Sequence, residues 1–340
     1  MSGPSPSLAL ACLLLVLLAA CAPGQTATGT ADRTTADNAT ADAQQSDGDD
    51  TTASGSPATS ASPATFAASV PAGTHLRVRE IGRRPHDRTA FTQGLEFDGD
   101  RLFESRGLFA TDEQITLTQI DPSDGSALRE VLRDPVVGDY FAEGLTVVDD
   151  RLIQLTWRSN TALVYDVDTL VKTGEFVYEG EGWGICDQPD RLIMSNGTPT
   201  LTQRDLDTFE VLASVTVTLD GQPVDELNEI ECVDGLVWAN VWNTNTIVVI
   251  DPDTGTVVTQ VDVSALADEA GRFIEDPKSG AVLNGIAYDP VTDTWLITGK
   301  QWPFMFEVEF DCTAGCDEGS PAVTPSHYVR PRDLPPVQQG

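Results

Sequence analysis

The feature that most constrains this chain is a unit that recurs five times between residues 94 and 312. Each unit opens with a short apolar segment, at Gly94, Gly144, Gly184, Glu229 and Gly285, which gives spacings of 50, 40, 45 and 56 residues. A second apolar segment follows after a turn, and a third runs into an Asp-containing turn, the last one at residues 310–312 (FDC). Short β-branched and aromatic runs separated by Asp, Pro and Gly predict strands joined by turns.

A repeat of this kind predicts a ring of similar sheets. A four-stranded unit with a period of 40 to 56 residues and no long helical pattern is typical of a β-propeller blade. We therefore predict an all-β, five-bladed β-propeller over residues 73–335. The last unit lacks an outer strand, and residues 76–80 resemble the outer-strand segment 127–131, so we expect residues 76–80 to complete the fifth blade. A β-sandwich is the alternative, but it leaves the five copies unexplained.

The first 72 residues have a different character. Residues 8–20 form one apolar run of thirteen, too short to span a bilayer and of the length of a signal-peptide core. Residues 18–21 (LAAC) resemble a bacterial lipobox, in which the cysteine, here Cys21, is lipidated; an ordinary secretory signal cut near Ala20 is the alternative. We expect a lipoprotein signal peptide over residues 1–21, a disordered Thr/Ala/Ser/Asp-rich tether over 22–72, and an extracytoplasmic protein lipid-anchored to the cell membrane.

Charge and histidine content narrow the possible partners and chemistry. The chain has 53 acidic and 20 basic residues, a net charge of −33, which argues against nucleic acid or an anionic membrane surface as a partner. Its three histidines, His75, His86 and His327, lie near the ends of the predicted domain, and none is expected in a blade core. We therefore expect neither a histidine-rich zinc site nor a central Ser-His-Asp triad, and we predict no metal or other cofactor.

Four cysteines follow Cys21, and an even number permits disulfides in an exported protein. Cys312 and Cys316 would close a short loop at the last predicted turn, with a modest entropic gain. Cys186 and Cys232 fall on the innermost strands of adjacent predicted blades. A disulfide between them and two buried free thiols are equally supported.

Polar and aromatic residues gather where the predicted innermost strands begin. Glu143 stands between apolar residues there, where a buried carboxylate needs a partner or a task. Lys300 is one of three lysines against seventeen arginines, which suggests a need for a compact ammonium group. Trp157, Trp183 and Trp242 recur at corresponding blade positions and would form an apolar cage. A structural Glu143–Lys300 ion pair and ordinary core tryptophans are the alternatives.

Taken together, several segments resemble the plant and bacterial glutamine cyclotransferase family. They are residues 91–95 (FTQGL), 143–146 (EGLT), 155–157 (LTW), 182–184 (GWG), 227–229 (LNE), 283–287 (LNGIA) and 298–300 (TGK). The resemblance covers residues 76–310 in order, and its motifs are specific as a set although each alone is weak. It assigns the family's active-site positions to Phe91, Gln93, Glu143, Trp157, Trp183, Asn228, Trp242 and Lys300.

The resemblance implies a glutaminyl-peptide cyclotransferase, an acyltransferase that closes an N-terminal Gln to pyroglutamate and releases ammonia. In this scheme Glu143 is the general base and then the general acid, while Lys300 and Asn228 polarise the γ-carbonyl. The tryptophans fold the substrate and exclude water, and Phe91 and Gln93 orient the amine and the first peptide bond. The expected partners are peptides or proteins with N-terminal Gln, and we expect a monomer.

Two other functions compete with this one. Many exported propellers bind a ligand or a protein and catalyse nothing. A propeller hydrolase of lactone type needs a channel cation held by several carboxylates and asparagines, and Glu143, Asn228 and Asn284 are few for that purpose.

Overall fold

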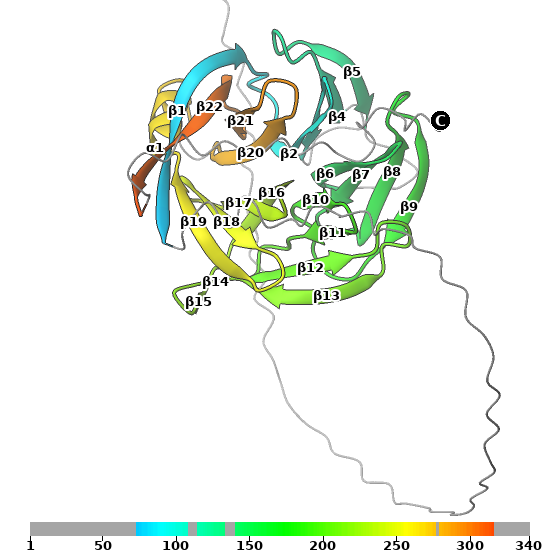
Figure 1. Cartoon of the computed structure of the whole chain (residues 1–340). Coiled ribbons are helices and arrows are strands. Elements are labelled where there is room, and N and C mark those ends of the chain that lie inside the picture. The colour runs from blue at the N-terminus through cyan, green and yellow to red at the C-terminus, as the bar shows by residue number, and fades with distance from the viewer. Residues whose placement is uncertain (1–72, 108–113, 133–139, 277–278, 316–340) are drawn as a thin grey trace, which may run out of the picture. The chain divides into compact units, whose positions relative to one another are not determined.

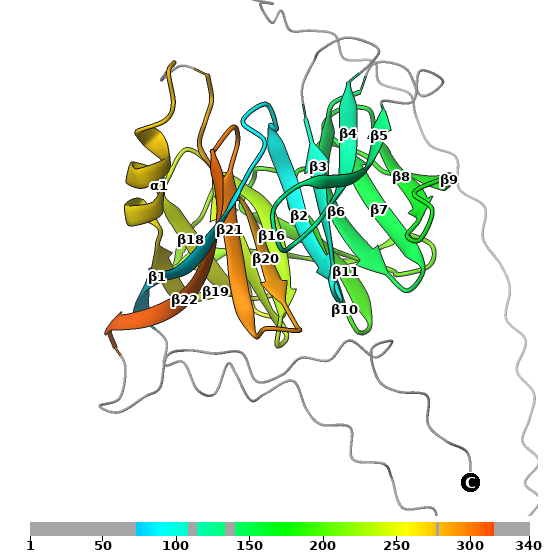
Figure 2. The same cartoon turned by 90° about the horizontal axis from the view of Figure 1, so that it is seen from above.

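The computed structural model describes residues 73–107, 114–132, 140–276 and 279–315, all within the unit formed by residues 59–340. This part is all-β apart from one short helix, α1 (Ser264–Gly271), which packs beside the first strand (Figure 2). None of its helices has the length and apolar character needed to cross a membrane. The predicted signal peptide, Cys21 and the tether lie outside the described residues.

Three four-stranded antiparallel sheets follow one another along the chain, each with its strands in sequence order. The first holds β2 (Thr92–Asp98), β3 (Arg101–Arg106), β4 (Ile115–Ile120) and β5 (Ala127–Leu132). The second holds β6 (Ala142–Val148), β7 (Arg151–Thr156), β8 (Thr161–Asp166) and β9 (Lys172–Val177). The third holds β10 (Ile185–Gln188), β11 (Arg191–Met194), β12 (Thr200–Arg204) and β13 (Val211–Thr216).

A larger, ten-stranded sheet contains the first and the last described strands of the chain. Its path is β16-β17-β18-β19-β1-β22-β21-β20, with β14 and β15 paired beside β19. The strands are β1 (Thr74–Pro85), β14 (Thr218–Leu219), β15 (Gln222–Pro223), β16 (Leu227–Val233), β17 (Leu236–Val241), β18 (Thr246–Asp251), β19 (Thr256–Asp262), β20 (Leu283–Asp289), β21 (Thr294–Gly299) and β22 (Phe304–Ala314). β1 pairs antiparallel with β22 and parallel with β19, which confirms that residues 76–80 pair with the last strand of the fifth repeat.

The prediction of a turn at residues 310–312 is wrong. β22 continues to Ala314, and its Asp311 and Cys312 pair with Arg77 and Leu76 of β1. In the other repeats the fourth strand follows the third directly, so a hairpin is required and an Asp stabilises it; Asp166, for example, accepts hydrogen bonds from the Thr169 backbone N–H at 2.8 Å and hydroxyl at 2.6 Å. The fifth repeat needs no such hairpin, because its outer strand arrives from the other end of the domain.

The first strands of the five repeats lie innermost in a propeller-like arrangement (Figure 1). They contact one another in the closed cycle β2, β6, β10, β16, β20. The repeated glycine permits this approach, since a Cβ on Gly144 would lie 2.7 Å from the Gly184 Cα. In the fourth repeat Glu229 replaces the glycine, and its carboxylate accepts the backbone N–H groups of Leu95 at 3.3 Å and Ile286 at 2.9 Å. The Glu229 side chain thus links β16 to β2 and β20.

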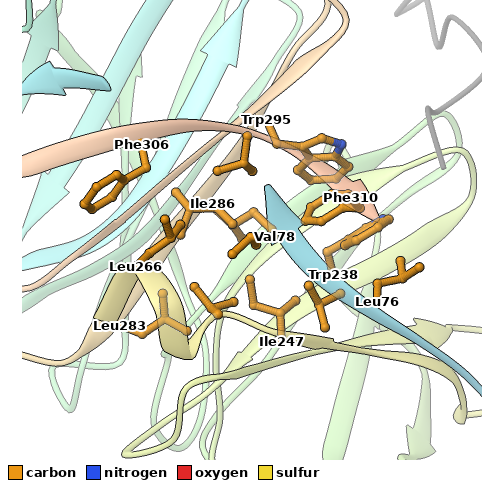
Figure 3. Close-up of a cluster of buried hydrophobic side chains, with 14 of the residues drawn as sticks. Leu76, Val78, Trp238, Ile247, Leu266, Leu283, Ile286, Trp295, Phe306 and Phe310 are labelled. Atoms are coloured by element: carbon orange, nitrogen blue, oxygen red, sulfur yellow. The ribbon is translucent and has the colours of Figure 1, made fainter. Parts of the chain in front are cut away.

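The largest apolar cluster among the described residues contains side chains from β16–β19, from β20–β22 and from β1, all strands of the ten-stranded sheet (Figure 3). Trp238 of β17 lies 4.4 Å from Trp295 of β21 and stacks at 5.0 Å on Phe310 of β22, measured between ring centroids. Replacing a buried tryptophan of this kind with alanine costs about 3–5 kcal/mol. The cluster therefore stabilises the junction where the two ends of the domain meet.

Disulfides and one buried histidine also lie in the described part of the chain. Cys186 of β10 and Cys232 of β16 form a disulfide that joins the third sheet to the ten-stranded sheet. Cys312 is also disulfide-bonded, while Cys316 lies outside the described residues. The expectation that no histidine lies in the core is wrong for His86: its side chain is 1 % exposed, and its Nε2 lies 2.9 Å from the Glu104 carboxylate. His86 is buried because Glu104 offers it an equally buried partner.

Candidate active site

Antiparallel pairing brings the predicted site residues to one end of the sheets. The start of each first strand faces the end of the second strand, as in the pairs Ala142–Thr156, Leu227–Val241 and Leu283–Gly299. In three repeats, the residue directly after the second strand donates its backbone N–H to the carbonyl of the residue directly before the first strand. These hydrogen bonds are Trp157 to Phe141 (2.9 Å), Trp242 to Glu226 (2.8 Å) and Lys300 to Val282 (2.9 Å). Trp157, Trp242 and Lys300 therefore occupy equivalent positions in three repeats. The expectation that the three tryptophans recur at corresponding positions is wrong for Trp183, which precedes the first strand β10 instead of following a second strand.

These residues line a cavity of about 170 Å³. All eight residues predicted from the sequence contribute to it, together with Phe141, which the sequence reasoning did not place in the site. The nine lining residues are Phe91, Gln93, Phe141, Glu143, Trp157, Trp183, Asn228, Trp242 and Lys300. Such a volume suits a small side chain rather than a large ligand.

Aromatic rings form most of the wall. Phe141 meets Phe91 edge-on at 6.2 Å and Trp157 at 6.0 Å, and Trp183 meets Trp242 at 5.6 Å, all between ring centroids. Edge-to-face contacts at these distances are the favoured geometry of aromatic pairs. These rings give the cavity a largely apolar wall.

Two charged groups contact the aromatic rings of this wall. The Lys300 Nζ lies 4.8 Å from the Phe91 ring centre and 5.9 Å from that of Trp242. On the other side, the Glu181 carboxylate accepts the indole N–H of Trp157 at 2.7 Å and that of Trp183 at 3.0 Å. The sequence did not single out Glu181.

Burial shifts the two ionisable groups inside the cavity in opposite directions. Glu143 is only 5 % exposed, and this burial raises the pKa of its carboxyl group well above 4.5. The Lys300 charge opposes the rise, and the Glu181 charge adds to it. Burial also lowers the pKa of Lys300 to about 8, against the attraction of Glu143. Burial therefore disfavours the charged form of both groups.

Gln93 and Asn228 are the uncharged polar residues that line the cavity. The Asn284 Nδ2 donates to the Gln93 Oε1 at 3.1 Å and to the Thr92 carbonyl at 2.9 Å. Gln93 itself lines the cavity. The Asn228 Oδ1 is buried and has no protein partner in the described part of the chain. Asn284 is thus a neighbour that orients Gln93, outside the set of predicted site residues.

The missed residues differ in how visible they are in the sequence. Phe141 stands three residues before Gly144, as Phe91 stands before Gly94, so the repeat contains a signal for it. Glu181 lies in the loop before β10, in the acidic run 179–182 (EGEG), and nothing in the repeat marks it. As for metals, no three His, Cys, Asp or Glu side chains come together as ligands anywhere in the described ranges.

Most of the chain is similar to known glutamine cyclotransferases. The family model described as glutamine cyclotransferase matches residues 52–310, which begins within the predicted tether. The glutaminyl-peptide cyclotransferase of Arabidopsis thaliana is 35 % identical over 234 residues, 68 % of this chain and 71 % of the relative. The crystal structure of Myxococcus xanthus glutaminyl cyclase superposes with a TM-score of 0.65 at 36 % identity, covering 71 % of this chain and 99 % of the other. With its cavity residues in place and most of its length matched, this chain belongs to the glutamine cyclotransferase family.

Proposed function

We propose that this protein is a glutaminyl-peptide cyclotransferase, which converts the N-terminal Gln of peptides or proteins to pyroglutamate and releases ammonia. The observation that carries the proposal is a small aromatic cavity that contains a carboxylate, Glu143, with a raised pKa and an ammonium, Lys300, with a lowered pKa. The family relationship supports the same reaction.

We also propose that the fold is a five-bladed β-propeller. The ten-stranded sheet divides into two groups of four, β16–β19 and β20–β22 with β1, at the single parallel pairing of β1 with β19 along its main path. Together with the three separate sheets these groups make five four-stranded blades. The closed cycle of the five first strands supports this division.

The reaction needs two proton transfers and one stabilised charge. The α-amine nitrogen bonds to the γ-carbonyl carbon, and Glu143 takes a proton from that nitrogen as general base. The carbonyl oxygen becomes negative, and Lys300 and Asn228 stabilise it by donating hydrogen bonds. When the carbonyl re-forms, the carbon–nitrogen bond of the side-chain amide breaks, and Glu143 returns the proton to the leaving nitrogen. The products are pyroglutamate and ammonia, and Glu143 is again a carboxylate.

The wall of the cavity supports cyclisation. Trp157, Trp183 and Trp242 surround a volume of about 170 Å³, which favours the folded conformer in which the amine approaches the γ-carbonyl. Apolar walls also limit the water that would compete for the polar groups. Gln93, oriented by Asn284, donates to the carbonyl of the first peptide bond, and Phe91 packs beside it.

We base a proposal for the location of this activity on the predicted N-terminal segments. We propose that Cys21 carries a lipid, that residues 22–72 tether the domain, and that the enzyme acts as an extracytoplasmic monomer without a metal cofactor. The LAAC sequence at residues 18–21 and the change of composition after it support this location.

The direct test is ammonia release from a Gln-initiated dipeptide by the purified protein, with pyroglutamate identified by mass spectrometry. An acetylated Gln dipeptide is the control, because it has no free amine to attack the carbonyl. Ammonia from the free dipeptide alone, unchanged by chelator, supports the proposal. Binding without turnover would indicate a non-catalytic propeller, and activity abolished by chelator and restored by a cation would contradict the metal-free mechanism.

A further inference from the structure

Two of the three cavity tryptophans share one hydrogen-bond acceptor outside the cavity lining. The Trp157 Nε1 and the Trp183 Nε1 both donate to the Oε2 of Glu181, at 2.7 Å and 3.0 Å. The other oxygen of Glu181 accepts from the Arg158 Nε at 2.7 Å. The Arg158 guanidinium in turn lies over the Trp157 ring, 3.7 Å from its centre.

These contacts join two tryptophans that come from different parts of the chain. Trp157 follows β7 and Trp183 precedes β10, so the two indoles come from segments next to different sheets. An indole can rotate about its side-chain torsions unless both its face and its N–H are held. Glu181 holds both N–H groups at one atom, and Arg158 covers the face of Trp157.

Glu181 is ionised in this arrangement. Burial opposes the charge, but hydrogen bonds from Trp183, Arg158 and Trp157 outweigh it and hold the pKa of Glu181 below its ordinary value. Hydrogen bonds to a charged acceptor are stronger than those to a neutral one. The two indole N–H groups are consequently engaged, and the cavity receives the apolar parts of both rings.

We propose that Glu181 is a positioning residue, which fixes the planes of Trp157 and Trp183 and thereby shapes the pocket that receives the glutamine side chain. This inference rests on the proposed function. A simple surface ion pair with Arg158 would not require the indole contacts; such a pair contributes little because the Arg158 side chain is 63 % exposed.

Two substitutions of the same residue separate these roles. Glu181→Ala removes the acceptor and the charge, whereas Glu181→Gln removes the charge and keeps an amide oxygen that can accept both indole N–H groups. We expect Glu181→Ala to raise KM for a Gln dipeptide roughly tenfold or more, because the substrate must then bind to a pocket whose walls are no longer fixed. A tenfold change corresponds to about 1.4 kcal/mol of binding free energy. Glu181→Gln should recover most of that loss. The matched control is Glu179→Ala, an exposed glutamate two residues away that does not line the cavity.

Indole ¹⁵N NMR provides a readout that does not depend on turnover. Glu181→Ala should shift two of the tryptophan Nε1–H signals, those of Trp157 and Trp183, and Glu179→Ala should shift neither. If Glu181→Ala does not fold, the wild type is titrated with acid instead, and the same two signals should move together below the ordinary glutamate pKa.

The outcomes distinguish the inference from the proposed function. A wild type without ammonia release refutes the proposed function, whereas the NMR signals still test the contacts of Glu181. Equal KM values for wild type and Glu181→Ala would overturn the positioning role, as would equal losses in the Ala and Gln variants, since a charge alone would then explain the effect.

Discussion

The Glu143 carboxylate and the Lys300 ammonium line the same cavity, yet no ion pair joins them in the part of the chain that the structure describes. Lys300 lies instead near the rings of Phe91 and Trp242. A pair kept only for structure would be expected to make direct contact, because each charge is costly to bury alone. The lack of a direct ion pair favours the proposed reaction, in which each of the two groups acts on the substrate.

Lys300→Arg tests whether the ammonium acts on the reacting carbonyl. A guanidinium keeps the charge but is larger and planar, so it fits this cavity poorly. We expect the variant to fold with an unchanged melting temperature and to lose roughly a hundredfold in kcat, with a smaller change in KM, the scale seen when an oxyanion donor is removed. Steady-state kinetics on a Gln dipeptide, beside thermal unfolding, provide the measurement. Full activity in Lys300→Arg would assign the residue to structure.

The pH dependence of kcat/KM reports the ionisation of both cavity groups. Glu143 acts as a base only when it has lost its proton, so activity should rise with pH along a limb that lies above 4.5, in the direction of its raised pKa. Lys300 donates only when protonated, so activity should fall again near pH 8. In Lys300→Arg the residual activity should lose that alkaline limb, since arginine keeps its proton. A limb that persists unchanged in the variant would belong to the substrate amine and would contradict this assignment to Lys300.

Glu104 should make the fold sensitive to acid. Burial disfavours its charge, but His86 and Arg106 outweigh this and lower its pKa to about 2 from 4.5. A lowered folded-state pKa stabilises the protein above the unfolded value, so this contribution, on the order of 3 kcal/mol, is lost as pH falls from about 4.5 towards 2. Urea unfolding at several pH values should show Glu104→Gln destabilised at pH 7 and progressively closer to wild type in acid. A constant difference between the two proteins across this range would contradict the prediction.

Cys21→Ala tests the proposed membrane location. A lipid holds a protein at a membrane through its buried methylene groups, each contributing about 0.8 kcal/mol. The variant should therefore move from the membrane fraction to the soluble fraction and retain its specific activity, because Cys21 precedes the catalytic domain. Fractionation with the activity assay checks both points. A Cys21→Ala protein that remains membrane-bound would refute the lipobox interpretation.

The sequence predicted those features that the repeat itself encodes. The five strand openings and the outer strand at residues 76–80 follow from local patterns. The eight cavity residues were assigned by the resemblance to the glutamine cyclotransferase family, and antiparallel pairing gathers them at one end of the sheets. The turn at Asp311 was predicted wrongly because the same Asp-containing pattern occurs there, while the pairing of β22 with β1 depends on the other end of the chain. Burial of His86 depends likewise on Glu104, eighteen residues away.

Glu181 marks the limit of such reasoning. Its loop sequence, EGEG, predicts an exposed turn. Trp157 precedes Glu181 by twenty-four residues and Trp183 follows it by two. Only the folded arrangement brings both indoles to the same carboxylate oxygen. A contact between three side chains of this kind has no periodic signature, whereas Phe141 repeats the position of Phe91 and was open to prediction.

Glu143→Gln is the most direct test of the central claim that one buried carboxylate transfers both protons of the cyclisation. The amide has nearly the same shape and cannot act as a base, so the fold should persist, as judged by circular dichroism. Pyroglutamate formation from a Gln dipeptide should fall by at least roughly a hundredfold, the scale of a lost general acid–base. Near-normal turnover in a correctly folded Glu143→Gln protein would remove Glu143 from the mechanism and contradict the account.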